Sequence, residues 1–515
     1  MRDFEETSTQ QHWAWSLKGV IAIASFYGLL HGLFRGLSSP VIGQDDVIAN
    51  VYVQTLEAGY AAKQGPIYEW LLWLVQLVTG PAGASFLFLK YALLTAITAF
   101  FYLSAKRVLQ SDVWAVLTAF SLSLIYQIGW NIHEGVTHTA VLTCFVIASF
   151  WAYLRIMERG RFGDYVLFGV FAGLGMLSKH TFGAYFLILA AASMMQAPLR
   201  RRFFNPRILI SLFVALAIMS PYLWWLATQS DVLLRAAGGM SGLASTRYLN
   251  GLLFGLPRLI VAPIGFLFPL IFILAVMFPG SLGQVMTAWR GGFKFGPEPD
   301  YERLIHHMTL IAFLFLFLAL IIFGIPRFFA RYMHPFFLVT VIGLVAYAMR
   351  ACRDGRQIRR YMLVMIALAV AVFPFRAGYL FVGAPLFCAK CRQMVPYQPL
   401  AEWLRVQGFE RGTLMGGFRH VAGNMRLYFP EARIISLKNP VYVPPTKHQS
   451  GQPIVVVWNP ATDGELLPKR AKTELERLGV TAIEDPQTLR IPWTHSWKPT
   501  GYRHSEWRIL FINPG

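Results

Sequence analysis

Residues 306–324 read HHMTLIAFLFLFLALIIFG, and every residue from Leu310 to Phe323 in this run is apolar. A helix needs ~20 such residues to cross the ~30 Å hydrocarbon core of a bilayer. The same criterion applied outward along the chain predicts eleven spans in all. They are 14–34, 84–104, 112–130, 137–154, 162–178, 180–196, 208–228, 253–278, 306–324, 333–349 and 361–378.

The composition agrees with a protein that spans a membrane many times. Of the 515 residues, 56% are hydrophobic and 14% are charged, whereas soluble proteins have ~25% charged residues. This excludes a disordered, fibrous or ordinary cytosolic protein. The net charge is +20, but no basic arm with interleaved aromatic residues is present, so no nucleic-acid partner is expected.

Loop charges predict the orientation. With the N-terminus inside, the inner loops hold 17 Lys and Arg residues, among them Arg200, Arg201 and Arg202, against ten in the outer loops and helix ends up to residue 389, as the positive-inside rule requires. An odd number of spans then places the C-terminal part outside. The expected domains are a membrane domain, 1–389, and a soluble domain, 390–515. The run IYEWLLWLVQLVT (67–79) is too short to span and predicts a helix at the membrane surface.

The soluble segment alternates strands and helices, which predicts a small α/β domain. The expected strands are 413–417, 432–436, 453–458 and 508–512, and the expected helices are 420–428 and 468–478. The run GGFRHVAG (416–423) weakly resembles a Gly-rich phosphate loop, and we interpret it as a plain turn.

Two adjacent acids, Asp45 and Asp46, follow the first span in VIGQDDVIANVYVQTLEAGY (41–60). Aspartate favours a helix start, so one interpretation is that the pair caps a helix. The other is a general base at the membrane face, which takes a proton from an acceptor hydroxyl.

Two further polar stretches lie on the predicted outer side. KQGPIYEW (63–70) is interpreted either as a turn before an aromatic helix or as part of a substrate cavity, through Gln64 and Tyr68. WNIHEGVTH (130–138) offers a polar cluster for the same cavity, formed by His133, Glu134 and His138. Its H-E-x-x-x-H spacing is not the i, i+4 pair of zinc enzymes, so no metal is indicated, although a divalent ion is not excluded.

Outer cations complete the candidate site. Lys179 ends the run GLGMLSK (173–179), and Arg327 and Arg331 belong to GIPRFFARYMHPFF (324–337). Arg258, in an apolar stretch, and Tyr332 of the same run are expected in the substrate cavity. Long cationic side chains near helix ends reach for lipid headgroups. Alternatively, the cations hold an anionic phosphate and stabilise it as it departs.

These motifs resemble the glycosyltransferases of the GT-C class, in the branch of the protein O-mannosyltransferases and the lipid A aminoarabinose transferase (families 39 and 83). The resemblance covers residues 10–380 and rests on the paired acids, G-P-I-Y-x-W-L, the L-S-K end of a Gly-rich span and R-x-x-x-R-Y-x-x-P (327–335). The usual Asp-Glu pair is Asp45-Asp46 here, and the usual Pro-Pro is Gly65-Pro66.

The resemblance implies a polytopic helical enzyme, with surface helices in its first outer loop, that transfers a sugar from a polyprenyl-phosphate donor with inversion. Asp45 would be the base and Asp46 its helper. Lys179, Arg327 and Arg331 would contact the donor phosphate, with Lys63 beside them. The acceptor would be lipid A or lipopolysaccharide core, another glycan or a protein hydroxyl, at the periplasmic face of a bacterial inner membrane. No cofactor is implied.

Two other functions remain open on the sequence. A lipid or glycolipid transporter would also place ionisable residues in its spans, although no internal repeat is evident. A membrane scaffold with a periplasmic binding domain is the other. Cys388 and Cys391 form a C-x-x-C without the second pair that a metal site needs, and we expect a local disulfide or free thiols there.

Overall fold

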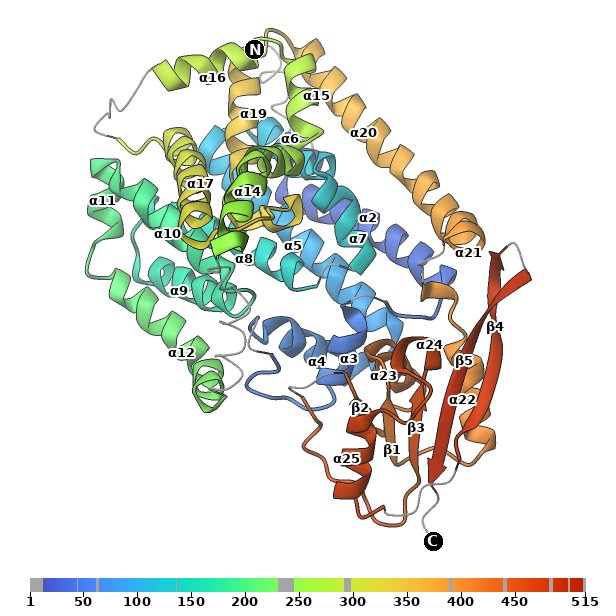
Figure 1. Cartoon of the computed structure of the whole chain (residues 1–515). Coiled ribbons are helices and arrows are strands. Elements are labelled where there is room, and N and C mark those ends of the chain that lie inside the picture. The colour runs from blue at the N-terminus through green and yellow to red at the C-terminus, as the bar shows by residue number, and fades with distance from the viewer. Residues whose placement is uncertain are drawn as a thin grey trace. The chain divides into compact units, whose positions relative to one another are not determined.

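The computed structural model describes residues 13–43, 45–61, 64–135, 137–229, 245–290, 298–388, 392–438, 442–480, 485–498 and 501–512. Most of the chain is helical, and the C-terminal part contains a sheet (Figure 1). The chain forms two compact units that do not follow chain order. Unit 1 is Met1–Gly28, Ala62–Ile67 and Lys90–Ala371, and unit 2 is Leu29–Ala61, Tyr68–Leu89 and Val372–Gly515.

Helices make up unit 1, and three of them (α2, α5 and α20) continue into unit 2. The helices are α2 (Leu17–Ser38), α5 (Gly83–Leu109), α6 (Asp112–Phe120), α7 (Ile132–Gly135), α8 (His138–Glu158), α9 (Phe162–Met176), α10 (Thr181–Met194), α11 (Ala197–Phe203), α12 (Ile208–Thr228), α14 (Ser245–Leu267), α15 (Leu270–Met277), α16 (Ser281–Arg290), α17 (Tyr301–Phe323), α18 (His334–Phe337), α19 (Thr340–Ala351) and α20 (Gly355–Gly378).

Within the described residues, eight helices are long and apolar enough to cross a membrane, and α15 with α16 adds a ninth if this bent pair forms one span. The multi-span helical architecture is therefore confirmed. Three of the eleven predicted spans, 112–130, 162–178 and 180–196, form shorter apolar helices. In the first of them the Ser121 hydroxyl bonds the Leu117 carbonyl at 2.6 Å, a contact that favours bending of a helix.

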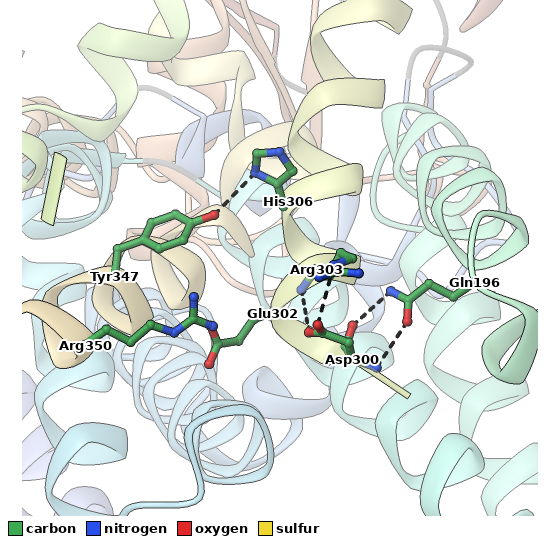
Figure 2. A network of polar contacts seen from close by, with 7 residues as sticks. All are labelled: Gln196, Asp300, Glu302, Arg303, His306, Tyr347 and Arg350. Carbon is green, nitrogen blue, oxygen red and sulfur yellow. Dashed lines mark hydrogen bonds and ion pairs between the residues drawn. The ribbon is translucent and has the colours of Figure 1, made fainter. Parts of the chain in front are cut away.

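A polar network ties α17 to its neighbours at its N-terminal end (Figure 2). Asp300 caps α17 by accepting a bond from the Arg303 amide at 2.9 Å. Gln196 pairs with the Asp300 backbone in both directions, at 2.9 and 3.1 Å. Glu302 pairs with Arg350 of α19. At the predicted inner end of unit 1, Asp300 and Glu302 therefore stabilise the packing of helices against one another.

Unit 2 contains a five-stranded sheet of order β2-β1-β3-β5-β4. Strands β1 to β3 are parallel, and β5 and β4 run antiparallel beside β3. The strands are β1 (Thr413–Gly416), β2 (Arg433–Ser436), β3 (Ile454–Trp458), β4 (Gln487–Lys498) and β5 (Gly501–Ile512). The remaining helices of unit 2 are α3 (Asp46–Tyr52), α4 (Ile67–Thr79), α21 (Ala384–Phe387), α22 (Tyr397–Val406), α23 (Arg419–Tyr428), α24 (Pro460–Asp463) and α25 (Lys469–Arg477).

Helices cover both faces of this sheet because side chains alternate along each strand. Leu414 packs in one core with Val421 and Met425 of α23. Met415, the next residue, packs in the other core with Leu475 of α25. The predicted small α/β domain is confirmed, and the helix expected at 67–79 is α4 with the same bounds.

The loop that was predicted to be the first outer loop belongs to the same compact unit as this sheet. Helix α3 packs against α23, and Tyr52 and Tyr60 form a ring cluster with Tyr442, with centroids 5.3 to 5.7 Å apart. By contacts, then, residues 29–61 group with residues 372–515. The predicted domain boundary at 389/390 separates residues by the side of the membrane on which they lie, not by contacts. It therefore stays a prediction.

Candidate active site

The two adjacent acids start helix α3 in different environments. Asp45 is at the N-cap position, but its side chain makes no capping hydrogen bond and is exposed. Asp46 is buried and accepts a hydrogen bond from the Tyr68 hydroxyl at 3.4 Å. Burial first, and then the Asp46 carboxylate, raises the pKa of Tyr68 well above its ordinary value. Tyr68 therefore stays a proton donor to Asp46, while Asp45 presents its carboxylate to the solvent side.

Amide side chains fix the loop that carries these acids. Asn424 of α23 pairs with the Ile42 backbone in both directions, at 3.0 and 3.1 Å. Gln54 pairs in the same way with Ile434, at 2.8 and 2.9 Å. Since β2 is an edge strand, the Gln54 amide also covers part of its exposed backbone. The acids thus lie between two clamps, one on each side.

Arg426 of α23 forms the centre of this attachment. It is 7% exposed, and its guanidinium donates to the Asn50 carbonyl (2.6 Å), the Asn50 side chain (2.9 Å), the Gln76 side chain (2.8 Å) and the Val53 carbonyl (3.2 Å). Burial lowers the pKa of Arg426 to about 10, so it keeps its charge at neutral pH. One side chain therefore joins α3, α4 and α23.

A glycine allows the two helices to approach this closely. A Cβ atom on Gly423 would lie 2.1 Å from the Val47 carbonyl oxygen, and the Gly423 carbonyl accepts a bond from Asn50 at 2.8 Å. Any side chain at this position would push α3, and the acids on it, away from α23.

In unit 1, the G-P-I-Y motif meets the end of the L-S-K motif. The Ile67 amide donates to the Leu177 carbonyl at 3.3 Å, and a Cβ atom on Gly65 would lie 2.2 Å from the same oxygen. The Gln64 carbonyl accepts a bond from the Tyr222 hydroxyl at 3.3 Å. Two motifs that are ~110 residues apart thus form one backbone junction, next to Lys179.

Lys179 lies in the break between α9 and α10, and its ammonium donates to the Thr139 hydroxyl of α8 at 2.6 Å. Four residues along α8, Thr143 bonds the His334 ring at 2.9 Å. His334 belongs to the R-x-x-x-R-Y-x-x-P run. The L-S-K motif and this later motif therefore both contact α8.

The predicted His-Glu-His cluster is held by hydroxyl groups. His133 bonds Tyr91 at 3.1 Å, and His138 bonds Thr137 at 3.0 Å. Glu134 is half-buried between them. Among the described residues, no three His, Cys, Asp or Glu side chains lie close enough to share a metal ion.

The late cations lie at the surface of unit 1. Arg258 donates to the Pro326 carbonyl at 2.7 Å, so it supports the loop that carries Arg327. Arg331 bonds the Tyr332 hydroxyl at 3.1 Å and stacks on Phe329 at 5.2 Å. Arg327, Arg331 and Tyr332 are all exposed.

The structure places Asp45, Asp46 and Tyr68 in unit 2, where Asp46 and Tyr68 are hydrogen-bonded, and the other described candidates in unit 1. Lys63 and Cys391 lie outside the described residues. Cys388 is disulfide-bonded. The sequence analysis did not identify Asn424 and Arg426 as functional residues. The available signal was the presence of three polar residues, His420, Asn424 and Arg426, on one helix between buried strands.

Residues 63–225 match the family model described as dolichyl-phosphate-mannose-protein mannosyltransferase. Two curated relatives are lipopolysaccharide core galacturonosyltransferases of Rhizobium johnstonii. RgtA is 26% identical over 93% of this chain and 94% of its own length, and RgtB is 24% identical over 94% and 96%.

Among solved structures, the chain is similar to ArnT from Cupriavidus metallidurans bound to undecaprenyl phosphate. The TM-score is 0.54 with 12% sequence identity, and the alignment covers 96% of this chain and 98% of ArnT. At 12% identity this likeness shows the fold alone, and it is the GT-C fold that the sequence motifs implied. The family model and the two relatives named above all describe enzymes that transfer a sugar.

Proposed function

We propose that this chain, a membrane glycosyltransferase with the GT-C fold, transfers a sugar from a polyprenyl-phosphate donor to the lipopolysaccharide core. The two relatives named above act on that core, and their alignments run along nearly the whole chain. The fold neighbour was solved with a polyprenyl phosphate. By analogy with those relatives, the donated sugar is a galacturonosyl group, delivered at the periplasmic face of the inner membrane.

The observation that carries the mechanism is the different environment of the two acids. Asp45 is exposed and makes no capping bond, so its carboxylate is available to take a proton from an acceptor hydroxyl. Asp46 is fixed by Tyr68. The acceptor oxygen forms a bond to the anomeric carbon, the bond from that carbon to the phosphate oxygen breaks, and the configuration inverts.

Cations stabilise the phosphate as it leaves, because its negative charge grows in the transition state. We assign this role to Lys179, which follows the junction of the two motifs and whose ammonium donates to the Thr139 hydroxyl. Arg327 and Arg331 offer further exposed guanidinium groups. Glu134, His133, His138, Gln64 and Tyr332 line the acceptor side in this proposal.

The direct test uses the purified chain in lipid nanodiscs with polyprenyl-phosphate galacturonic acid and a lipopolysaccharide core acceptor. We expect the acceptor mass to increase by one sugar residue, with free polyprenyl phosphate released. Donor that crosses the membrane of a proteoliposome without any covalent product would instead indicate a transporter. Donor that is neither bound nor used would contradict both functions.

Lys179→Met is expected to weaken donor binding about tenfold and to slow transfer about 10²-fold, because one charge-assisted contact to the phosphate is lost. Lys179→Arg is expected to restore part of both. Donor affinity and single-turnover rates give the two effects separately. Lys106→Met is the matched control, since Lys106 pairs with Asp112 in a half-exposed ion pair. Equal losses in the two Met variants would contradict the assignment.

Cysteine labelling tests the orientation. Cys352 is partly exposed after α19, in a loop predicted to be inside, and Ser450 is exposed in the soluble domain. In intact spheroplasts, an impermeant maleimide is expected to label a Ser450→Cys variant and to leave Cys352 unlabelled until the membrane is opened. The reverse pattern would contradict the orientation and the periplasmic placement of the acids.

A further inference from the structure

We propose that the soluble domain contains a phosphate-binding site at the start of α23, formed around Phe418 by Arg392, Arg419 and Lys438, and that it holds a phosphate group of the acceptor glycolipid. The identity of the molecule that carries this phosphate rests on the proposed function. The site itself does not, because it is built from contacts within unit 2.

The topology places the site where α/β proteins bind ligands. Strands β1, β2 and β3 are parallel, so their carboxyl ends lie at one edge of the sheet. β1 has β2 on one side and β3 on the other, and a crevice outside the strand ends is favoured where connections diverge in this way. Gly417 and Phe418 follow β1, and Lys438 follows β2.

Two glycines let the chain turn from β1 into α23. A Cβ atom on Gly416 would lie 2.6 Å from the Ala422 amide, and one on Gly417 would lie 2.6 Å from an Asp463 carboxylate oxygen. The strand, the Gly-Gly turn and the helix thus share the strand–turn–helix order of a phosphate loop, without its G-x-x-x-x-G-K-[ST] sequence. The run that we interpreted as a plain turn therefore has the structural context that its sequence alone did not establish.

Three cations gather around one aromatic ring at this turn. The guanidinium carbons of Arg392 and Arg419 lie 5.0 and 5.8 Å from the centre of the Phe418 ring, and the Lys438 ammonium lies 5.3 Å from it. Lys438 pairs with the buried Asp463 carboxylate at 2.7 Å. In the part of the chain that the structure describes, Arg392 and Arg419 have no such acid, and both are exposed. Their like charges repel unless an anion joins them.

The helix start adds the Arg419 and His420 amides as hydrogen-bond donors, whereas the Val421 amide already donates to the Phe418 carbonyl at 3.0 Å. Phe418 is the N-cap residue of α23, and no side chain caps this end. Ser, Thr, Asp or Asn usually accepts a bond from the first-turn amides at this position. Without one, these amides and the positive end of the helix dipole favour a bound anion.

Two buried polar groups beside the turn also lack partners among the described residues. They are Nδ1 of His420, which is 5% exposed, and the hydroxyl of Ser436 at the carboxyl end of β2, which is 0% exposed. Burial, and then Arg392 and Arg419, lowers the pKa of His420 to about 3, so the ring is neutral and can donate a hydrogen bond. A buried polar group without a partner is costly, and an oxyanion would satisfy both groups.

A phosphate suits this set better than a carboxylate does. Its three or four oxygens can accept bonds from two guanidinium groups and from first-turn amides at once. A lipopolysaccharide acceptor can supply such a group as a sugar phosphate, and free phosphate offers the same chemistry. The site therefore gives the soluble domain a means of orienting an anionic acceptor.

The first arm of the test measures inorganic phosphate binding by ³¹P line broadening, with the full chain in nanodiscs. An R392S/R419S variant is expected to bind at least tenfold more weakly than the wild type, since two charge-assisted contacts are lost. R405S/R411S is the matched control, because both arginines are exposed on the same domain. Unchanged binding in R392S/R419S, or no binding by the wild type, would overturn the site.

The second arm identifies the carrier by comparing a phosphorylated acceptor with the same acceptor after phosphatase treatment. R392S/R419S is expected to raise KM for the phosphorylated acceptor about tenfold, to leave kcat and donor KM near normal, and to have no effect with the treated acceptor. If phosphate binding is lost but the acceptor KM does not change, the acceptor assignment is wrong. If the wild type transfers no sugar, the proposed function fails, and the first arm still decides the site.

Discussion

Asp45→Asn is expected to lower the rate of sugar transfer by about 10²–10⁴-fold, the usual contribution of a positioned general base. This equals roughly 3–5 kcal/mol in the barrier, at 1.36 kcal/mol per factor of ten. Asparagine has the same shape as aspartate but cannot take the proton. Because Asp45 is exposed and makes no capping bond, the substitution should cost little stability, and donor affinity should stay near normal.

The matched comparison is Asp46→Asn. Asp46 is buried against Tyr68, and an asparagine oxygen can still accept that hydrogen bond, so transfer should fall by less than in Asp45→Asn. Single-turnover transfer from a defined donor, measured beside donor affinity, separates the two. Near-normal transfer in Asp45→Asn would remove it as the base and shift the role to Asp46 or Glu134.

Arg426→Met is expected to lower the free energy of unfolding of unit 2 by about 3 kcal/mol, because a buried polar group left without its partner costs about 1–3 kcal/mol. Methionine keeps much of the packing volume but leaves the Asn50, Gln76 and Val53 oxygens without their donor. Helix α3 should then detach, and transfer should fall with it even where the chain still folds.

Thermal unfolding in nanodiscs and protease resistance of the 41–60 loop measure this effect. Arg405→Met is the control, since Arg405 is exposed and donates one bond to the Tyr428 carbonyl, and a surface change of this kind usually costs under ~1 kcal/mol. Equal effects of the two substitutions would show that Arg426 does not hold the loop.

The sequence predicted those parts of the fold that depend on local pattern. Long apolar runs predicted most of the spans. The strand at 453–458 was evident because β3 has the sequence IVVVW, from Ile454 to Trp458. It did not predict β4, because Pro492 lies inside this strand. Proline is tolerated there since β4 is at the edge of the sheet.

The candidate site was predicted only in part, for a similar reason. Asp45, Asp46 and Lys179 belong to recognisable short motifs, so their residue types and spacing were informative. The contacts of Arg426 with Asn50 cross 376 residues. No periodicity or motif relates positions so far apart, and a buried arginine on an otherwise ordinary helix looks like a solvated charge until the tertiary structure is known.

The clamps on the 41–60 loop also determine when the enzyme can become active during its synthesis. Gln54 bonds a residue 380 positions later in the chain, and ribosomes add ~5–20 residues per second. The interval between the two is therefore roughly 20–80 s at that speed. For that time the nascent protein already contains its two acids but not strand β2, whose Ile434 backbone Gln54 bonds. Catalytic competence is thus delayed until translation is almost complete.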